Sequence, residues 1–354
     1  GLRACLPAAD ILVLRSHALS QPISLAIEDG IAVITIDSPP VNAISAAIRR
    51  GLLAITRDLA TNRDARAVVL VCAGRTFMAG ADISEFGGVM APPELRNVLT
   101  EFESLPQPIV VALHGTALGG GVEVALAGHY RIADKGAKVG FPEITLGIVP
   151  GAVGTQRLPR IVGAEKALAM FLDGRPVGAE EAKQLGLVDE IAEGDLRTAA
   201  IAYAKRLLAE GRGARRVRDN KVAPLTEAQI AAFRAQAAKQ HKGMITPELD
   251  IAAVRASWEL PFEQGLKVER EGFAKLLNSP ESAALRHAFF GERAAAKVAD
   301  IGTGGAYLRT AGAPPAGTAV LIEIYPPGSA SAHLIEGRVA WQPSATKVTC
   351  FERK

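Results

Sequence analysis

The chain has 354 residues, enough to bury a large core and to hold more than one domain. Its 40 Lys and Arg residues nearly balance 37 Asp and Glu residues, and a net charge of +3 argues against a nucleic-acid-binding protein. Hydrophobic residues make up 49% of the sequence. No apolar stretch reaches the roughly 18 residues needed to cross a bilayer, so we expect no membrane span.

The cysteine content predicts a reducing, intracellular compartment. Cys5, Cys72 and Cys350 are widely separated and show no metal-ligand spacing with the six histidines, so no metal site is expected. The cytoplasm is the simplest location, and an organelle stays open. Residues 1–21 are interpreted as an N-terminal tail without a secretory signal. Their two arginines and single acid leave a transit peptide as the alternative.

Strand and helix patterns alternate along the first part of the chain. A helix is predicted after Asn42, with Ser45 as its N-cap, and a glycine-led helix over 119–127. Short apolar runs predict strands at 31–37, 67–72, 108–115 and 130–133. This alternation favours an α/β layer structure.

Two glutamates stand twenty residues apart, each in glycine-rich sequence. Glu123 lies in Ala-Leu-Gly-Gly-Gly-Val-Glu-Val (117–124), and Glu143 in Gly-Phe-Pro-Glu-Ile-Thr-Leu-Gly (140–147). Paired carboxylates can hold one water and move one proton, and glycines let backbone N–H groups approach a ligand. A lone glutamate would instead suggest a salt bridge, and a lone glycine triplet a tight turn or close helix packing.

These two motifs, together with Phe-Met-Ala-Gly-Ala-Asp-Ile (77–83), resemble the enoyl-CoA hydratase/isomerase (crotonase) family. The resemblance covers residues 22–195 and is specific, because three motifs occur in the family's order and spacing. It implies an α/β catalytic core built as a spiral of repeated β-β-α turns. The substrate would be an acyl-CoA thioester, and no cofactor is expected beyond the coenzyme A that is part of that substrate.

The resemblance also assigns roles to residues. Glu123 would orient and help deprotonate a water, and Glu143 would give a proton to the α-carbon. The backbone N–H groups of Ala81 and Gly120 would form an oxyanion hole; Gly120 also starts a predicted helix, where the helix dipole favours an anion. Further substrate or coenzyme A contacts are expected from Ala79, Gly80, Asp82, Ile83, Gly119, Gly121, Pro142 and Gly151. Asp82 has helix capping as its alternative role, and Phe86, Met90 and Leu99 are either acyl-pocket or core residues.

Residues 196–297 have a different character. Segments 196–210, 226–240 and 281–297 predict helices, and segment 262–293 is similar to the linker of multifunctional fatty-acid oxidation enzymes. The basic run 211–221 is interpreted as a solvated connector, with an aid to binding coenzyme A phosphates as the alternative.

Residues 298–354 are left as an unassigned tail with one strand-like stretch at 319–325. Gly302-Thr303-Gly304 begins a dinucleotide fingerprint, but Tyr307 occupies the third glycine position. Fewer than 60 residues are too few for a complete dinucleotide-binding domain, so we expect neither a dehydrogenase domain nor NAD.

The resemblance implies a 2-enoyl-CoA hydratase of fatty-acid beta-oxidation, a lyase, with 3-enoyl to 2-enoyl isomerisation as a second activity. Three alternatives stay open: isomerisation alone, thioester hydrolysis, and a non-catalytic RNA-binding or scaffold subunit. Single-function hydratases imply a trimer or a pair of trimers, whereas the fused enzymes imply a monomer. The sequence leaves this choice open.

Overall fold

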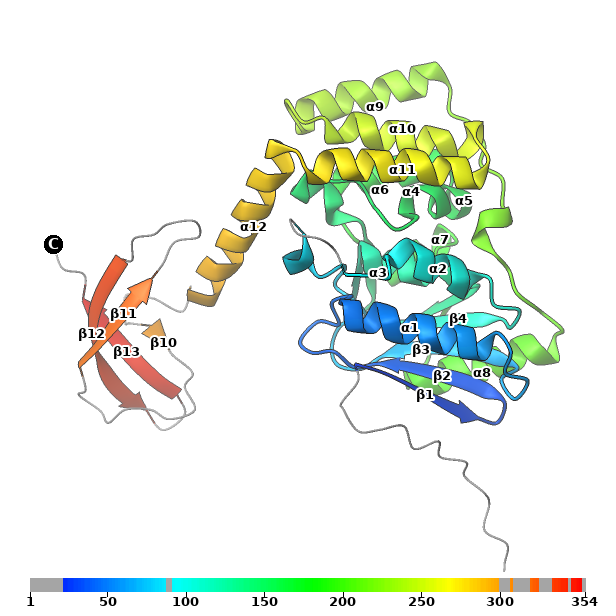
Figure 1. The fold of residues 1–354 in the computed structure, drawn as a ribbon, viewed down its shortest axis with the longest axis horizontal. Helices are drawn as coiled ribbons and strands as arrows, with labels where there is room; N and C mark the ends of the chain where they lie inside the picture. Colours follow the sequence, from blue (N-terminus) through cyan, green and yellow to red (C-terminus); the bar gives the residue numbers. More distant parts are fainter. Residues whose placement is uncertain are drawn as a thin grey trace, which may run out of the picture.

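The computed structural model describes residues 22–86 and 91–298, together with the backbone of four strands between 306 and 351. Its main sheet has six strands in the order β1-β2-β3-β4-β6-β9 (Figure 1). Strand β1 is antiparallel to β2, and the other neighbours are parallel. The bounds are β1 Ile23–Glu28, β2 Ile31–Ile36, β3 Ala67–Cys72, β4 Ile109–Leu113, β6 Tyr130–Ala133 and β9 Glu190–Ile191.

A second, smaller sheet runs in the order β5-β7-β8, with bounds Thr116–Leu118, Lys138–Gly140 and Val177–Gly178. Strand β5 follows β4 directly and β7 follows β6, so each chain turn sends one strand to each sheet. Single parallel bridges, Ile44 to Ala81 and Met78 to Ala117, extend the second layer to earlier turns. This arrangement confirms the predicted α/β spiral and stacks segments 78–81, 116–118 and 138–140 side by side.

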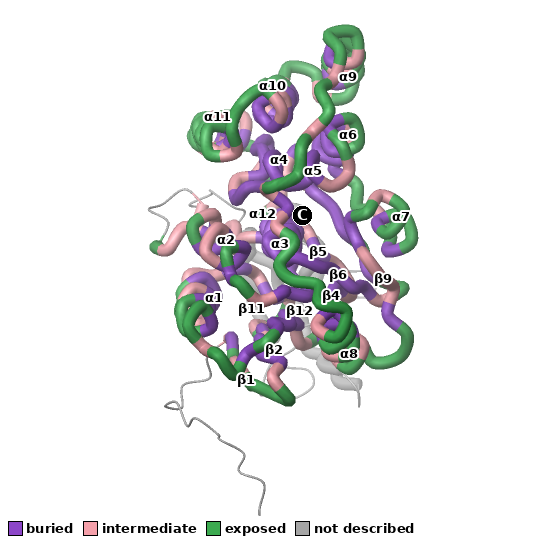
Figure 2. Tube along the Cα trace, turned by 90° about the vertical axis from the view of Figure 1, so that its right-hand side faces the viewer, coloured by how far each residue is buried: buried purple, intermediate pink, exposed green. Residues whose placement is uncertain are grey.

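Helices cover both faces of the main sheet because its strands are apolar on both sides. Alternate residues of β2, such as Ile31 and Val33, pack with α8 (Leu196–Ala209), whereas Ala32 and Ile34 join the larger core. Helix α1 (Ala46–Leu59) and helix α2 (Leu95–Glu103) lie beside that core. Helix α3 (Gly120–Ala127) is buried along its whole length (Figure 2).

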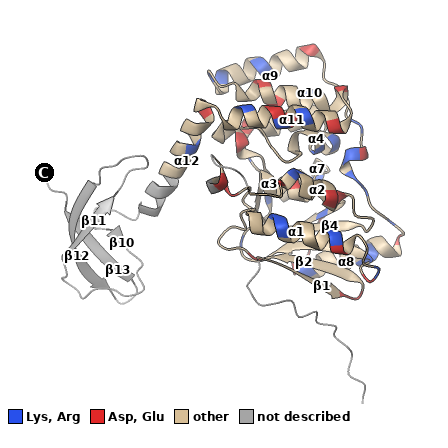
Figure 3. Ribbon diagram, viewed as in Figure 1, with Lys and Arg blue, Asp and Glu red and all other residues tan. Residues whose placement is uncertain are grey.

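Shorter helices lie between these elements and before the C-terminal helical layer. They are η1 Ile83–Glu85, η2 Pro142–Leu146, α4 Gly154–Arg157, α5 Pro159–Val162, α6 Ala164–Asp173, α7 Ala179–Gln184 and η3 Val217–Asp219. The layer contains α9 Glu227–Gln240, α10 Thr246–Glu259, α11 Phe262–Leu277 and α12 Pro280–Val298 (Figure 1). Figure 3 shows both charge signs interspersed along α9, α10 and α11. Of these long helices, α10 and α11 were not predicted from the sequence.

The unassigned tail contains more strands than the sequence predicted. Strands β10 Ala306–Tyr307, β11 Ala319–Ile324, β12 His333–Gln342 and β13 Ala345–Phe351 pair antiparallel in the order β10-β13-β12-β11. The single predicted strand at 319–325 corresponds to β11. The predicted N-terminal tail, residues 1–21, lies outside the described residues. Within the described part of the chain, no helix is both long enough and apolar enough to cross a membrane.

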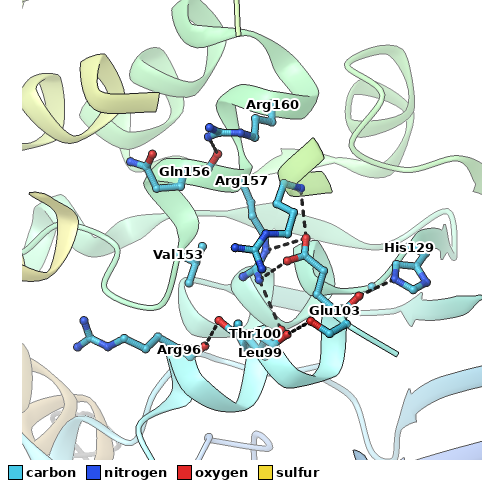
Figure 4. Close-up of polar contacts among 12 residues, drawn as sticks. Arg96, Leu99, Thr100, Glu103, His129, Val153, Gln156, Arg157 and Arg160 are labelled. Atoms are coloured by element: carbon cyan, nitrogen blue, oxygen red, sulfur yellow. Dashed lines mark hydrogen bonds and ion pairs between the residues drawn. The ribbon is translucent and has the colours of Figure 1, made fainter. Parts of the chain in front are cut away.

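A buried ion pair joins α2 to α4. Arg157 donates to both carboxylate oxygens of Glu103, at 3.3 Å from Nε and 2.8 Å from Nη2, and both side chains are out of contact with solvent (Figure 4). His129 bridges α2 and β4. Its Nδ1 accepts from the N–H of Ile109 on β4, so its Nε2 carries the proton and donates to the carbonyl oxygen of Glu103 on α2, at 2.9 Å. The ion pair holds α4 against α2, and the His129 bonds hold α2 against the main sheet.

Candidate active site

A cavity of about 380 Å³ lies where the second sheet layer, α3, η2 and the C-terminal helices meet. Its lining includes every residue predicted for catalysis or substrate contact except Gly121. A Cβ at position 121 would lie 2.4 Å from Met78 O, so this glycine lets α3 pack closely on the second layer. The structure therefore separates Gly121 from the other residues of the predicted site.

The two predicted oxyanion-hole residues are neighbours. Gly120 is the first residue of α3, and the first N–H groups of a helix have no acceptor within it. A Cβ at Gly120 would lie only 3.3 Å from Ala81 N. The backbone segments that carry these two residues therefore lie against each other. Gly80 and Gly119 precede these residues with φ values of +105° and +50°, a region that favours glycine.

Glu123 extends from the first turn of α3 to the cavity and is 3% exposed. Its Oε1 accepts hydrogen bonds from the N–H groups of Ala152 and Gly154, both at 2.7 Å. Burial raises the pKa of Glu123 well above its ordinary value, and the charges of Glu269 and Glu143 raise it further; the two N–H donors act in the opposite direction. The bonded oxygen is thus fixed, while the carboxyl binds its proton more tightly than an exposed glutamate.

Glu143 approaches the same cavity from η2, where Pro142 is the first helical residue. Its Oε2 is buried and has no hydrogen-bond partner among the described residues. Burial raises the pKa of Glu143 to about 8; the charges of Asp250 and Glu269 also raise it, and its own backbone N–H lowers it. The neutral acid is therefore the main form of Glu143 at neutral pH.

The segment that holds Glu123 has an unusual backbone. Val153 has φ +88° and ψ +7°, in the left-handed region that β-branched residues rarely occupy, at a cost of about 1–3 kcal/mol. Gly154 follows, and a Cβ there would lie 2.9 Å from Glu123 Oε1. The strained residue and the adjacent glycine thus turn two N–H groups toward one carboxylate oxygen.

Two buried acids beside the site were not predicted from the sequence. Glu269 on α11 is 2% exposed and accepts hydrogen bonds from segment 153–155, and Asp250 on α10 is 1% exposed. Burial raises the pKa of both, and the charge of Glu269 further raises that of Asp250. Glu269 stands among charged residues that resemble a solvated helix face. One signal was present, the spacing of Gly265, Glu269 and Phe273 at four-residue intervals, which places them on one helix face.

Much of the remaining wall of the cavity is apolar, although Glu94, Arg96 and Thr145 also line it. It contains Ile83, Phe86, Leu146, Phe273, Phe289 and Phe290. Phe86 and Phe273 meet edge to face, with ring centroids 6.1 Å apart. Of the three predicted acyl-pocket residues, Phe86 lines the cavity, Leu99 is a core residue that does not, and Met90 lies outside the described residues.

The basic run 211–221 contributes none of the residues that line this cavity. Arg212 and Arg215 lie over the ring of Tyr130, with guanidinium carbons 5.0 and 4.5 Å from its centroid. Arg218 pairs with Glu263 and lies over Phe262, 4.4 Å from the centroid. Arg212, Arg215 and Arg218 thus contact aromatic rings of the protein, and the interpretation of this run as a connector stays a prediction.

Comparison with known proteins gives a consistent result. A family model described as "Enoyl-CoA hydratase/isomerase" matches residues 26–250, more than half of the chain. The chain is 38% identical over 273 residues to the "Peroxisomal bifunctional enzyme" of Danio rerio, covering 77% of this chain and 38% of that protein. It is also 38% identical over 297 residues to the "Glyoxysomal fatty acid beta-oxidation multifunctional protein MFP-a" of Cucumis sativus, covering 80% and 41%.

The chain thus spans about two fifths of the length of these multifunctional relatives. A shorter relative, named "Probable enoyl-CoA hydratase", from Bacillus subtilis (strain 168), is 43% identical over 195 residues, covering 53% of this chain and 75% of that protein. Among solved structures, carnitinyl-CoA hydratase from Mycobacterium avium matches with a TM-score of 0.58 and 26% identity, covering 77% of this chain and 97% of that one. With this match in sequence and fold, the chain belongs to the enoyl-CoA hydratase/isomerase (crotonase) family.

Proposed function

We propose that this chain catalyses the hydration of 2-enoyl-CoA thioesters to 3-hydroxyacyl-CoA. One observation carries the proposal: Glu123 and Glu143 line one cavity with opposite hydrogen bonding, beside the N–H groups of Ala81 and Gly120. Burial and the neighbouring carboxylates raise the pKa of Glu123, and the two N–H donors on its Oε1 oppose that rise and stabilise the ionised form that accepts a proton from water. Glu143 has a buried oxygen without a donor, which favours its protonated form.

The addition divides between these two groups. A water held by Glu123 loses a proton to that carboxylate as its oxygen bonds to the β-carbon of the enoyl thioester. Negative charge moves to the thioester oxygen, where the N–H groups of Ala81 and Gly120 stabilise it; one such donor contributes about 3 kcal/mol at comparable sites. The carboxylic acid of Glu143 then gives its proton to the α-carbon. Proton transfer from Glu123 back to Glu143, through solvent, completes the cycle with one water consumed.

The apolar wall suits the other end of the substrate. Phe86, Phe273 and their neighbours offer an acyl chain a surface without polar partners, which favours burial of its methylene groups. The name of the glyoxysomal relative from Cucumis sativus places that protein in fatty-acid beta-oxidation. We therefore favour beta-oxidation as the metabolic context. An organellar location would match that of the peroxisomal and glyoxysomal relatives, and the cytoplasm is the alternative.

Isomerisation of 3-enoyl-CoA to 2-enoyl-CoA is a second candidate activity. It requires one group that removes a proton from the α-carbon and returns it to the γ-carbon, with no water added. Glu143 has the raised pKa and the unpartnered oxygen for this transfer. Glu123 would not be needed, which separates the two activities by mutation.

The first test is crotonyl-CoA hydration, followed as loss of the conjugated thioester absorbance. Wild-type protein should turn over, and Glu123→Gln and Glu143→Gln should each lower kcat at least about 100-fold, as expected for acid–base groups. Isomerisation of a 3-enoyl-CoA should survive in Glu123→Gln and fall in Glu143→Gln.

Glu101→Gln is the matched control, because Glu101 stands on α2 at the surface and pairs with exposed Arg57. Its kcat should stay within about twofold of wild type, since exposed ion pairs contribute little. Folded wild-type protein that binds the thioester without hydrating it would exclude the proposed function. Release of free coenzyme A would identify thioester hydrolysis instead.

A further inference from the structure

Helix α11 presents one face to the segment that carries the hydrogen-bond donors of Glu123. A Cβ at Gly265 of α11 would lie 2.2 Å from Gln156 Oε1. On the other side, a Cβ at Gly151 would lie 2.6 Å from Cδ2 of the Phe273 ring. Glu269 stands midway between these two contacts. Residues four apart share a helix face, so all three are directed at segment 151–156. The close contacts on either side fix the position of Glu269 along this segment.

Glu269 holds this segment through three hydrogen bonds. Its Oε1 accepts from Val153 N–H at 2.7 Å, and its Oε2 accepts from Thr155 N–H at 3.0 Å and from Thr155 Oγ1 at 2.6 Å. Hydrogen bonds to a carboxylate are about twice as strong as neutral ones. All three donors are buried, so water cannot replace the acceptor at no cost.

The two carboxylates divide the N–H groups of segment 152–155 between them. Glu123 takes those of Ala152 and Gly154, and Glu269 takes the two that alternate with them. The left-handed conformation of Val153 lies at the centre of this pattern. A strained backbone persists only where its surroundings hold it, and Glu269 accepts from the N–H of the strained residue itself, Val153.

We propose that Glu269 is a positioning residue for hydration: it fixes segment 152–155 so that this segment holds the carboxylate of Glu123 in place for the attacking water. This inference rests on the proposed hydratase function. The sequence predicted a catalytic core over residues 22–195. The proposal assigns part of the catalytic arrangement to α11, which lies outside that range. Glu269 does not line the cavity, so it acts through Glu123 and not on the substrate.

The test uses the full chain with Glu269→Gln, which keeps the side-chain size but turns an amide NH₂ toward one backbone donor. We expect kcat for crotonyl-CoA hydration to fall about 10- to 100-fold, the loss expected when a catalytic group is slightly misplaced. KM should stay within about twofold, because the replaced side chain does not line the cavity. Glu271→Gln, an exposed position on the same helix, is the control and should match wild type.

A double-mutant cycle separates positioning from general loss of structure. In a Glu123→Gln background, Glu269→Gln should change the residual rate by less than about twofold, because the residue through which it acts has already been altered. A further loss equal to that seen in wild type would overturn the proposal. If Glu269→Gln does not fold, Thr155→Val removes one of the three donors and should show the same pattern on a smaller scale.

Amide hydrogen exchange tests the inference without turnover. Residues 151–156 should exchange at least about tenfold faster in Glu269→Gln, while strand β3 stays protected, since local opening differs between segments. Unchanged exchange in this segment would overturn the positioning role even if the wild type hydrates crotonyl-CoA. Faster exchange in Glu269→Gln, together with a wild-type protein that lacks hydratase activity, would show that Glu269 holds the segment and would exclude the proposed function. Failure of the positioning role and failure of the hydratase function are therefore distinguishable.

Discussion

Gly119 leaves the space that the carboxylate of Glu143 occupies: a Cβ at residue 119 would lie 2.4 Å from Glu143 Oε1. Gly119 also has φ +50° and its N–H donates to Gly140 O at 2.9 Å, so the backbone cannot move aside freely. Gly119, the residue before Gly120 of the proposed oxyanion hole, therefore lies against the carboxylate of the proposed proton donor. Gly119 is thus required for two reasons: it adopts a positive φ, and it has no Cβ to clash with the carboxylate of Glu143.

We predict that Gly119→Ala lowers kcat for hydration about 100-fold by displacing Glu143, with a cost in stability of about 1–2 kcal/mol from the left-handed backbone. Isomerisation should fall as well, because it depends on the same carboxyl. Steady-state kinetics and urea unfolding measure the two effects. Gly178→Ala is the control, since nothing lies within 4 Å of a Cβ there; full activity in Gly119→Ala would contradict the prediction.

The Glu103–Arg157 pair should contribute strongly to stability only while both partners are present. Replacing Arg157 by Leu leaves the carboxylate of Glu103 buried without its cationic partner and with the Arg218 N–H, at 3.3 Å, as a remaining donor; we expect a loss of about 3–5 kcal/mol in the free energy of unfolding. The double variant Glu103→Leu, Arg157→Leu should recover part of this loss. Urea unfolding at neutral pH measures each value.

The exposed pair Arg57–Glu101 provides the comparison, because Glu101 stands on the same helix two residues earlier. Glu101→Leu should change stability by less than about 1 kcal/mol. Equal losses at positions 101 and 157 would show that burial does not decide the contribution of these pairs.

Local sequence predicted the elements whose signals are local. Ser45 was expected to cap α1, and its side chain accepts from Ile48 N–H. The strand over 67–72 was predicted with its observed bounds, because an apolar run between polar segments is characteristic of a buried strand. Glu123 and Glu143 could be selected because glycines beside each of them already indicated a close approach of backbone to ligand.

Glu269 could not be predicted in the same way. Its neighbours on α11 include Glu263 and Glu271, which are exposed, and the four-residue spacing with Gly265 and Phe273 shows a shared helix face but not whether that face is buried. Its burial results from the packing of α11 against α4, which is a tertiary contact between segments more than 100 residues apart. The second sheet layer was missed for a similar reason, since strands of three residues carry little pattern.

The pH dependence of hydration follows from the protonation state of Glu143. This group must be protonated to give a proton to the α-carbon, and burial raises its pKa to about 8. We therefore expect kcat/KM to decrease above about pH 8, approaching a tenfold loss per pH unit. Initial rates between pH 6 and 10 measure this limb, with stability of the protein checked at each pH. A rate that stays constant through pH 9.5 would show that Glu143 is not the proton donor.

Asp250 should make the folded protein less stable as pH rises. An acid with a raised pKa in the folded state binds more protons when folded, so the free energy of unfolding falls as pH increases above the unfolded value of about 3.9. Asp250→Asn removes this effect, because a side-chain amide stays neutral at every pH. We expect it to stabilise the protein by about 1 kcal/mol or more at pH 8 and to have little effect near pH 4. Exposed Asp58 on α1 is the control: Asp58→Asn should stay within about 0.5 kcal/mol at both pH values. A destabilised Asp250→Asn at pH 8 would mean that the ionised carboxylate has a stabilising partner and that its pKa is not raised.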